Sequence, residues 1–122
     1  MKLRRSSTVF VFLCAMLAVI LPLKVYAHAV LVESRPPVGA VVKGPVIPLW
    51  LRFNVRVDGS RSRCTLVLPD GSTKPLVLDL QSKPDVITGR VTASLAGDYK
   101  LRWQVLAADG HITRGEFVLK VK

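Results

Sequence analysis

The stretch that decides the fold is "GDYKLRWQVLAADGHITRGEFVLKVK", residues 97–122. Its two halves, 97–107 and 112–122, alternate apolar and polar residues, which is the period of strands with one face on a core. The residues between them, "ADGH", contain an Asp-Gly pair that is typical of tight turns between strands. The stretch therefore predicts a long hairpin whose turn carries Asp109 and His111.

The same alternation continues upstream, and no segment keeps a helical period for three turns. Two of the segments, 64–69 and 73–80, flank a second Asp-Gly pair at Asp70. Pro48 suggests that the segment 46–57 begins at a sheet edge or at a bulge. Seven short strands separated by turns predict an all-β fold, a seven-stranded antiparallel Greek-key β-sandwich or barrel. The strands are expected at 29–34, 46–57, 64–69, 73–80, 85–95, 97–107 and 112–122, with Trp50, Phe53, Trp103 and Phe117 in the core.

The first 27 residues have the pattern of a cleaved secretory signal peptide. A basic start, "MKLRRSS", is followed by the apolar run 8–23, and Val25 and Ala27 are the small residues expected before a cleavage site. The run is shorter than the roughly 20 residues of a spanning helix, although an uncleaved anchor is the alternative interpretation. We expect cleavage after Ala27, which leaves residues 28–122 as one small domain.

Cleavage changes the composition on which a functional interpretation rests. The formal charge falls from +10 to about +6, and both methionines and Cys14 leave with the signal. The remaining basic residues alternate with apolar ones, as on solvated strand faces, which argues against nucleic-acid binding. Cys64 has no partner for an intramolecular disulfide and is expected to be a small core residue.

The two histidines of the chain lie at positions that suggest a metal site. His28 becomes the N-terminal residue after cleavage, so its amine and its imidazole Nδ1 can chelate one metal. The imidazole of His111 can add a third nitrogen and Asp109 a carboxylate oxygen, since alternate residues of an extended segment point the same way. Gly110 between them would leave room for the ion. Three nitrogens and one oxygen favour Cu(II) over zinc, Cu(I) or calcium. The alternative is an ordinary turn on a metal-free sandwich that serves adhesion or assembly.

Three pieces of the sequence carry a resemblance to a known family. They are "HAVLVESRPPVGAVV" from His28, "LRFNVRV" from Leu51, and "GDYKLRWQVLAADGHITRGEFVLKV" from Gly97. The chain resembles the CopC family of periplasmic copper-binding proteins. The resemblance implies a cupredoxin-like or immunoglobulin-like sandwich with one Cu(II) ion held by His28, His111 and Asp109. It also implies a carrier or buffer role in copper resistance and homeostasis, with a CopD-type inner-membrane protein as partner.

The sequence departs from the family pattern at two places. Family members often carry a glutamate after the "FN" of the second long strand, near the copper, and this chain has Val55 there. Some members also hold Cu(I) in a methionine-rich loop, whereas residues 28–122 contain no methionine. We therefore expect a single Cu(II) site and no thioether site.

An enzymatic role is the further alternative. An N-terminal histidine and a second histidine on copper also describe oxygen-activating polysaccharide monooxygenases. A domain of about 95 residues with a directly bound carboxylate leaves little open coordination or substrate surface. We expect a soluble, monomeric periplasmic protein that is not an enzyme.

Overall fold

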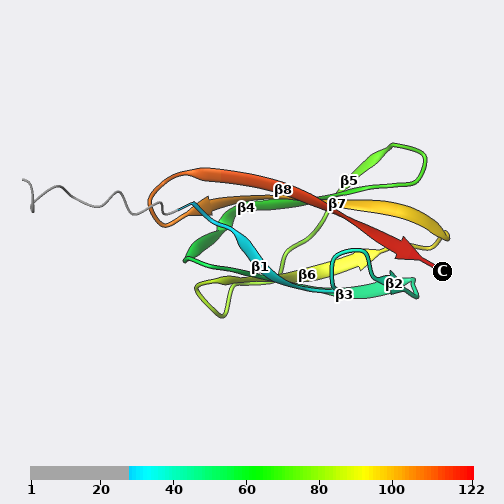
Figure 1. The fold of residues 1–122 in the computed structure, drawn as a ribbon, viewed down its shortest axis with the longest axis horizontal. Helices are drawn as coiled ribbons and strands as arrows, with labels where there is room; N and C mark the ends of the chain where they lie inside the picture. The colour runs from blue at the N-terminus through cyan, green and yellow to red at the C-terminus, as the bar shows by residue number, and fades with distance from the viewer. Residues whose placement is uncertain (1–27) are drawn as a thin grey trace, which may run out of the picture.

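The computed structural model describes residues 28–122, which fold into two β-sheets packed face to face (Figure 1). The three-stranded sheet has the order β1-β3-β6, with β1 (Leu31–Arg35), β3 (Val46–Phe53) and β6 (Val86–Thr92). The five-stranded sheet has the order β2-β8-β7-β4-β5, with β2 (Val41–Val42), β8 (Ile112–Val121), β7 (Gly97–Ala107), β4 (Val57–Val67) and β5 (Thr73–Pro75). The predicted all-β sandwich is confirmed. A search of these residues for a helix capable of crossing a membrane finds none.

The hairpin predicted from residues 97–122 is the longest pairing in the sandwich. β7 and β8 pair antiparallel in unbroken register from Gly97 opposite Val121 to Leu106 opposite Ile112. Alternate residues of β7 point into the core, beginning with Tyr99. The turn that joins the two strands lies at one end of the sandwich, at the left in Figure 1.

The core fills the space between the two sheets. Phe53 of β3 meets Trp103 of β7 edge to face, with ring centroids 5.2 Å apart, and so links the two layers. Phe117 is also buried, as expected, but Trp50 is only half-buried. The Trp50 ring lies on the outer face of its sheet, where the Arg35 guanidinium carbon stands 4.5 Å from the ring centroid.

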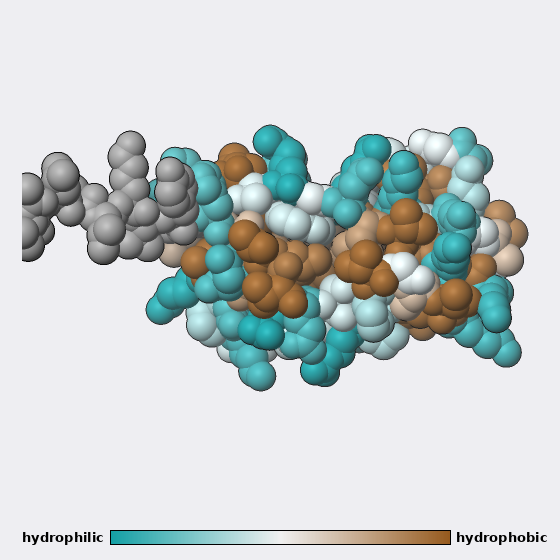
Figure 2. Space-filling model, in the orientation of Figure 1, coloured by the Kyte–Doolittle hydropathy of each residue, from teal (hydrophilic) through white to brown (hydrophobic). Residues whose placement is uncertain are grey.

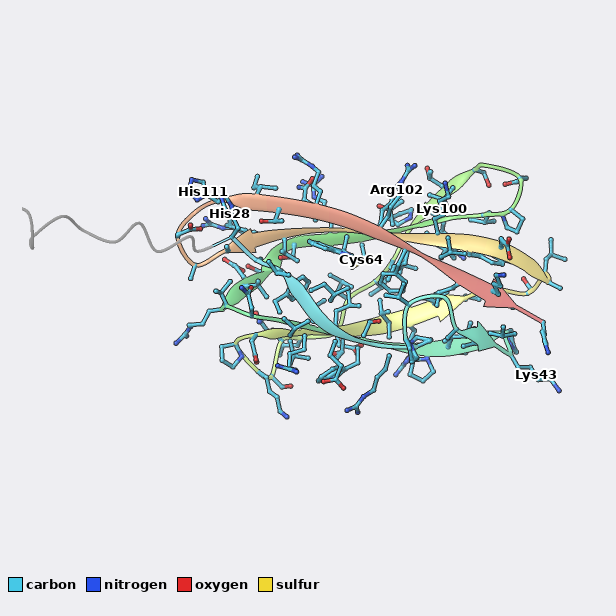
Figure 3. All side chains as sticks on the ribbon, viewed as in Figure 1. His28, Lys43, Cys64, Lys100, Arg102 and His111 are labelled. Atoms are coloured by element: carbon cyan, nitrogen blue, oxygen red, sulfur yellow. The ribbon has the colours of Figure 1, made fainter. Side chains whose placement is uncertain are left out.

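Cys64 lies in the core between the sheets, as its sequence position suggests (Figure 3). Burial raises the pKa of its thiol to about 12. The thiol is therefore protonated at neutral pH and is neither a nucleophile nor a ready metal ligand in the folded protein.

Two details of the predicted topology are wrong. Residues 28–122 form eight strands rather than seven, because β2 adds a two-residue pairing with β8, and this pairing is parallel. The sheets are thus not purely antiparallel. A pairing of two residues leaves no periodic pattern in the sequence, since it depends on where a loop is carried by the rest of the fold.

The segment expected as one strand, 46–57, is divided in the structure. β3 ends at Phe53, the chain bends over residues 54–56, and β4 begins at Val57 in the other sheet. β4 then continues through residues 58–62, where the sequence "DGSRS" predicts a break, and its pairing with β7 is irregular between Asp58 and Arg63. Pro48 does lie at an edge: the pairing with β1 stops at Trp50, so only β6 is paired beside Pro48.

The surface is charged on the sheet faces and apolar along part of one edge. Figure 2 shows apolar side chains gathered in the middle of the side that carries β1, between hydrophilic margins. The exposed apolar residues from this part of the chain are Val30, Val32, Val38, Val41 and Val46, which are 47–66% exposed.

Tyr99 holds the loop before β7 to the sandwich. Its ring is 2% exposed, and its hydroxyl donates a hydrogen bond of 2.8 Å to the carbonyl oxygen of Leu95, four residues upstream. This is the tyrosine corner of Greek-key sandwiches. The bond satisfies a carbonyl at the point where the chain enters the long hairpin.

Replacing Tyr99 with phenylalanine should lower the free energy of unfolding by about 1–2 kcal/mol, because the Leu95 carbonyl loses its donor while the apolar ring is kept. Urea denaturation followed by tryptophan fluorescence measures this. An unchanged midpoint with an unchanged slope would show that the hydroxyl does not stabilise the corner.

Candidate metal centre

Both histidines of the chain lie at the same end of the sandwich (Figure 3). His28 precedes β1 of the three-stranded sheet, and His111 directly precedes β8 of the five-stranded sheet. Their ring centroids are 5.2 Å apart and the ring planes are inclined by 33°. At this separation one nitrogen of each ring can reach a single ion.

Asp109 is bound to His111 through both carboxylate oxygens. Its Oδ1 accepts a hydrogen bond of 3.0 Å from the backbone N–H of His111, and its Oδ2 lies 2.7 Å from Nδ1 of the His111 ring. The first of these bonds, followed by the contact with the ring, lowers the pKa of Asp109 below its usual value. The carboxylate is therefore ionised across the neutral range and fixes the orientation of the imidazole.

The turn that holds these residues is built a second time in the same chain. At Asp70-Gly71-Ser72, Oδ1 of Asp70 accepts from the backbone N–H of Ser72 at 2.9 Å and from its hydroxyl at 2.6 Å. The flanking backbone bonds match as well, at 2.8 and 2.9 Å in both turns. The turn is thus ordinary Asx-turn chemistry. What distinguishes the Asp109 turn is the imidazole of His111, where the Asp70 turn has the hydroxyl of Ser72.

Gly110 has a backbone conformation that favours glycine. Its φ is +87°, close to the +85° of Gly71 in the other turn. A Cβ built on Gly110 would have no neighbouring atom within 4 Å. The left-handed φ by itself favours glycine here. The expectation that Gly110 also leaves room for an ion stays a prediction.

The segment that carries His28 is held in place beyond the end of the β1–β3 pairing. Ala29 is 1% exposed and packs in the core. Next to it, the N–H of Val30 donates to Oδ1 of Asn54 at 2.7 Å, and the N–H of Asn54 donates to the Val30 carbonyl at 3.0 Å. Sequence reasoning missed this contact, because the two residues lie 24 positions apart and Asn54 was expected inside the strand 46–57.

The bend at residues 54–56 also contacts the turn that carries His111. The carbonyl oxygen of Arg56 accepts a hydrogen bond of 3.0 Å from the N–H of Ala108. Between these contacts, Val55 is half-buried and packs against the core. The position at which the resemblance expects a glutamate thus supplies an apolar contact and no carboxylate.

The donor set is two imidazoles and one carboxylate, which is suited to a divalent transition metal. The 2.7 Å between Oδ2 of Asp109 and Nδ1 of His111 fits a hydrogen bond. It is also close to the separation of neighbouring ligands on one ion, about 2.8 Å when each lies about 2.0 Å from the metal at a right angle. Over residues 28–122, side chains of His, Cys, Asp and Glu form no group of three or more that is already arranged to hold a metal ion.

The histidine pair is a surface feature and not a pocket. The side chain of His111 is 65% exposed. A hollow of about 760 Å³ lies elsewhere, between β4 and residues 75–81, and Cys64 is on its wall. Neither histidine lines this hollow, and the raised pKa of Cys64 keeps its thiol protonated there.

Comparison with known proteins finds one family over nearly the whole described chain. The CopC domain family matches residues 31–122. The chain is 28% identical over 101 residues to Protein YobA of Escherichia coli K12, which covers 80% of this chain and 82% of that protein.

Two solved structures have the same fold. CopC from Methylosinus trichosporium OB3b is 27% identical with a TM-score of 0.66, covering 78% of this chain and 94% of that one. PcoC, a methionine-rich copper resistance protein from Escherichia coli, has a TM-score of 0.61 over 79% of this chain and all of its own. At 21% identity, the likeness to PcoC supports the fold alone.

The repeated turn predicts a matched pair of effects on stability. Asp70→Ala and Asp109→Ala each remove one Asx bond from an exposed turn, so each should lower Tm by a similar small amount. Differential scanning calorimetry without added metal measures both. A much larger loss for Asp109→Ala would mean that this carboxylate carries structure beyond its turn.

Proposed function

Since the chain belongs to the CopC family, we propose that it is a periplasmic copper-binding protein that carries or buffers one Cu(II) ion in copper resistance and homeostasis. The observation that carries the proposal is the meeting of His28 and His111, with ring centroids 5.2 Å apart, at one end of the sandwich. These are the chain's two histidines, and 83 positions of sequence separate them.

The proposed site is completed by processing. Cleavage after Ala27, which lies outside the described residues, would convert the backbone nitrogen of His28 from an amide into an amine. An amine binds a divalent metal once it loses its proton, whereas an amide nitrogen does so poorly near neutral pH. The amine and imidazole of His28, the imidazole of His111 and the carboxylate of Asp109 then supply three nitrogens and one oxygen. This set favours Cu(II), which also heads the divalent affinity order.

The exposure of the site suits a protein that receives an ion and passes it on. With its side chain 65% exposed, His111 can meet a second protein without an opening motion of the sandwich. We propose a CopD-type inner-membrane protein as the partner in this transfer. The role is one of binding, and the chain is proposed to act as a soluble monomer without enzymatic activity.

Copper binding should depend on the free amine of His28. Protein exported and cleaved before His28 should give an axial, nitrogen-rich Cu(II) signal in electron paramagnetic resonance. Protein with one additional residue before His28 should lose that signal and bind more weakly. Equal Cu(II) affinity in the two forms would contradict the amine ligand, and no affinity in either would leave the chain as a metal-free sandwich.

Of the two turn carboxylates, only that of Asp109 should contribute to the Cu(II) affinity. Asp109→Ala should weaken Cu(II) binding by about ten- to a hundredfold, as for other groups that bind or orient a metal ligand. Asp70→Ala is the matched control, because it removes the same kind of turn bond at the opposite end of β7 and should bind copper as the parent does. Competition with a chromophoric chelator measures both affinities. An equal loss of Cu(II) affinity in the two variants would show that Asp109 is not a ligand of the metal.

A further inference from the structure

We propose that Asn54 is the positioning residue of the metal centre, and that the bend it begins, residues 54–56, sets the spacing of the two histidines. This inference rests on the proposed copper-binding function. The hydrogen bonds that support it join Asn54 to Val30 and not to either histidine. Asn54 acts on the site through the backbone of Val30, two residues beyond His28.

The first step is that the sheet alone does not hold His28. The pairing of β1 with β3 ends at Leu31 opposite Phe53, and its register is already irregular between Leu31 and Glu33. The three residues before Leu31 lie outside the strand. Beyond one backbone bond, from the N–H of Asn54 to the Val30 carbonyl, the ladder does not continue toward them, because the chain bends away at Asn54 to enter the other sheet.

The second step is that the Asn54 side chain replaces the missing ladder. The Oδ1 atom of Asn54 accepts a hydrogen bond of 2.7 Å from the N–H of Val30, where a strand would offer a backbone carbonyl. The backbone N–H of Asn54 donates to the Val30 carbonyl at 3.0 Å. Together with the buried methyl of Ala29, these bonds fix the two residues that directly follow His28.

The third step is that the same bend fixes the other histidine. The Arg56 carbonyl accepts the N–H of Ala108, which lies in the turn with His111, and Val57 pairs with Ala107 directly after the bend. Asn54 and Arg56 are two residues apart, and Val55 between them is anchored in the core. One short, packed segment therefore ties the two ligand-bearing segments to each other.

Asn54 is exposed, so a substitution there leaves no cavity and its effect can be separated from folding. Asn54→Ala removes the oxygen that holds Val30 but keeps the backbone half of the pair. Asn54→Asp keeps an acceptor oxygen at the same place and is the rescue variant. Asp70→Ala removes a comparable side-chain-to-backbone bond from the distant turn and is the control for general loosening.

The test uses the exported protein, with its N-terminus established as His28 by mass spectrometry. For Asn54→Ala we expect Cu(II) binding about three- to tenfold weaker, the loss of one ordinary hydrogen bond. The paramagnetic resonance signal should also broaden as His28 samples more positions. Asn54→Asp should bind within about twofold of the parent, and Asp70→Ala should not change binding. Parental affinity in Asn54→Ala, or equal weakening by Asp70→Ala, would overturn the proposal.

A second measurement decides the role of Asn54 without copper. In the metal-free protein, nuclear Overhauser contacts between the His28 and His111 rings should be present in the parent and in Asn54→Asp and be lost in Asn54→Ala. Ring contacts that persist in Asn54→Ala overturn the positioning role whatever the copper result. A parent that shows the contacts but binds no copper refutes the proposed function and leaves the positioning role standing.

Discussion

The structure depends on the unbroken pairing of β7 with β8. This ladder runs from Gly97 opposite Val121 to Leu106 opposite Ile112 and forms the centre of the larger sheet. Because it is in strict register, every second residue of β7 faces the core, and the turn that closes the ladder is held at one end of the sandwich. His111 owes its place to this register, since a slip of β8 by one residue would turn its buried face outward.

The second histidine reaches the same place by way of the crossing between the sheets. β3 belongs to the three-stranded sheet and β4 to the five-stranded one, so residues 54–56 must pass from one layer to the other. They do so at the end of the sandwich where the β7–β8 turn lies, and there they bond to Val30 on one side and Ala108 on the other. A connection that the topology requires in any case thus becomes the scaffold on which two distant segments meet. The proposed metal centre needs no pocket, only this meeting.

Much of the fold could be predicted from the sequence, because alternation of apolar and polar residues is a local signal. The hairpin of residues 97–122 and the Asp-Gly turns follow from it directly. The prediction that Trp50 lies in the core was wrong, although its alternation with the buried Leu49 and Leu51 places its ring on the opposite face. The division of residues 46–57 did not follow. Alternation continues through Arg56 although the chain bends at Asn54, since a change of sheet is decided by packing far away in sequence. The parallel pairing of Val41 and Val42 with β8 could not be predicted either, because two residues are too few to show a periodic pattern. For the site, the residue types and the resemblance indicated His28, Asp109 and His111. The contact of Asn54 with Val30 has no local sequence signature at all.

The central claim is that one ion of copper sits between the two histidines at the end of the sandwich. The most direct measurement is a crystal structure of the exported protein with one equivalent of Cu(II), with anomalous scattering recorded on both sides of the copper absorption edge. We expect a single copper peak within bonding distance of ring nitrogens of both His28 and His111. A copper peak at any other place, or no peak in a fully ordered domain, would contradict it.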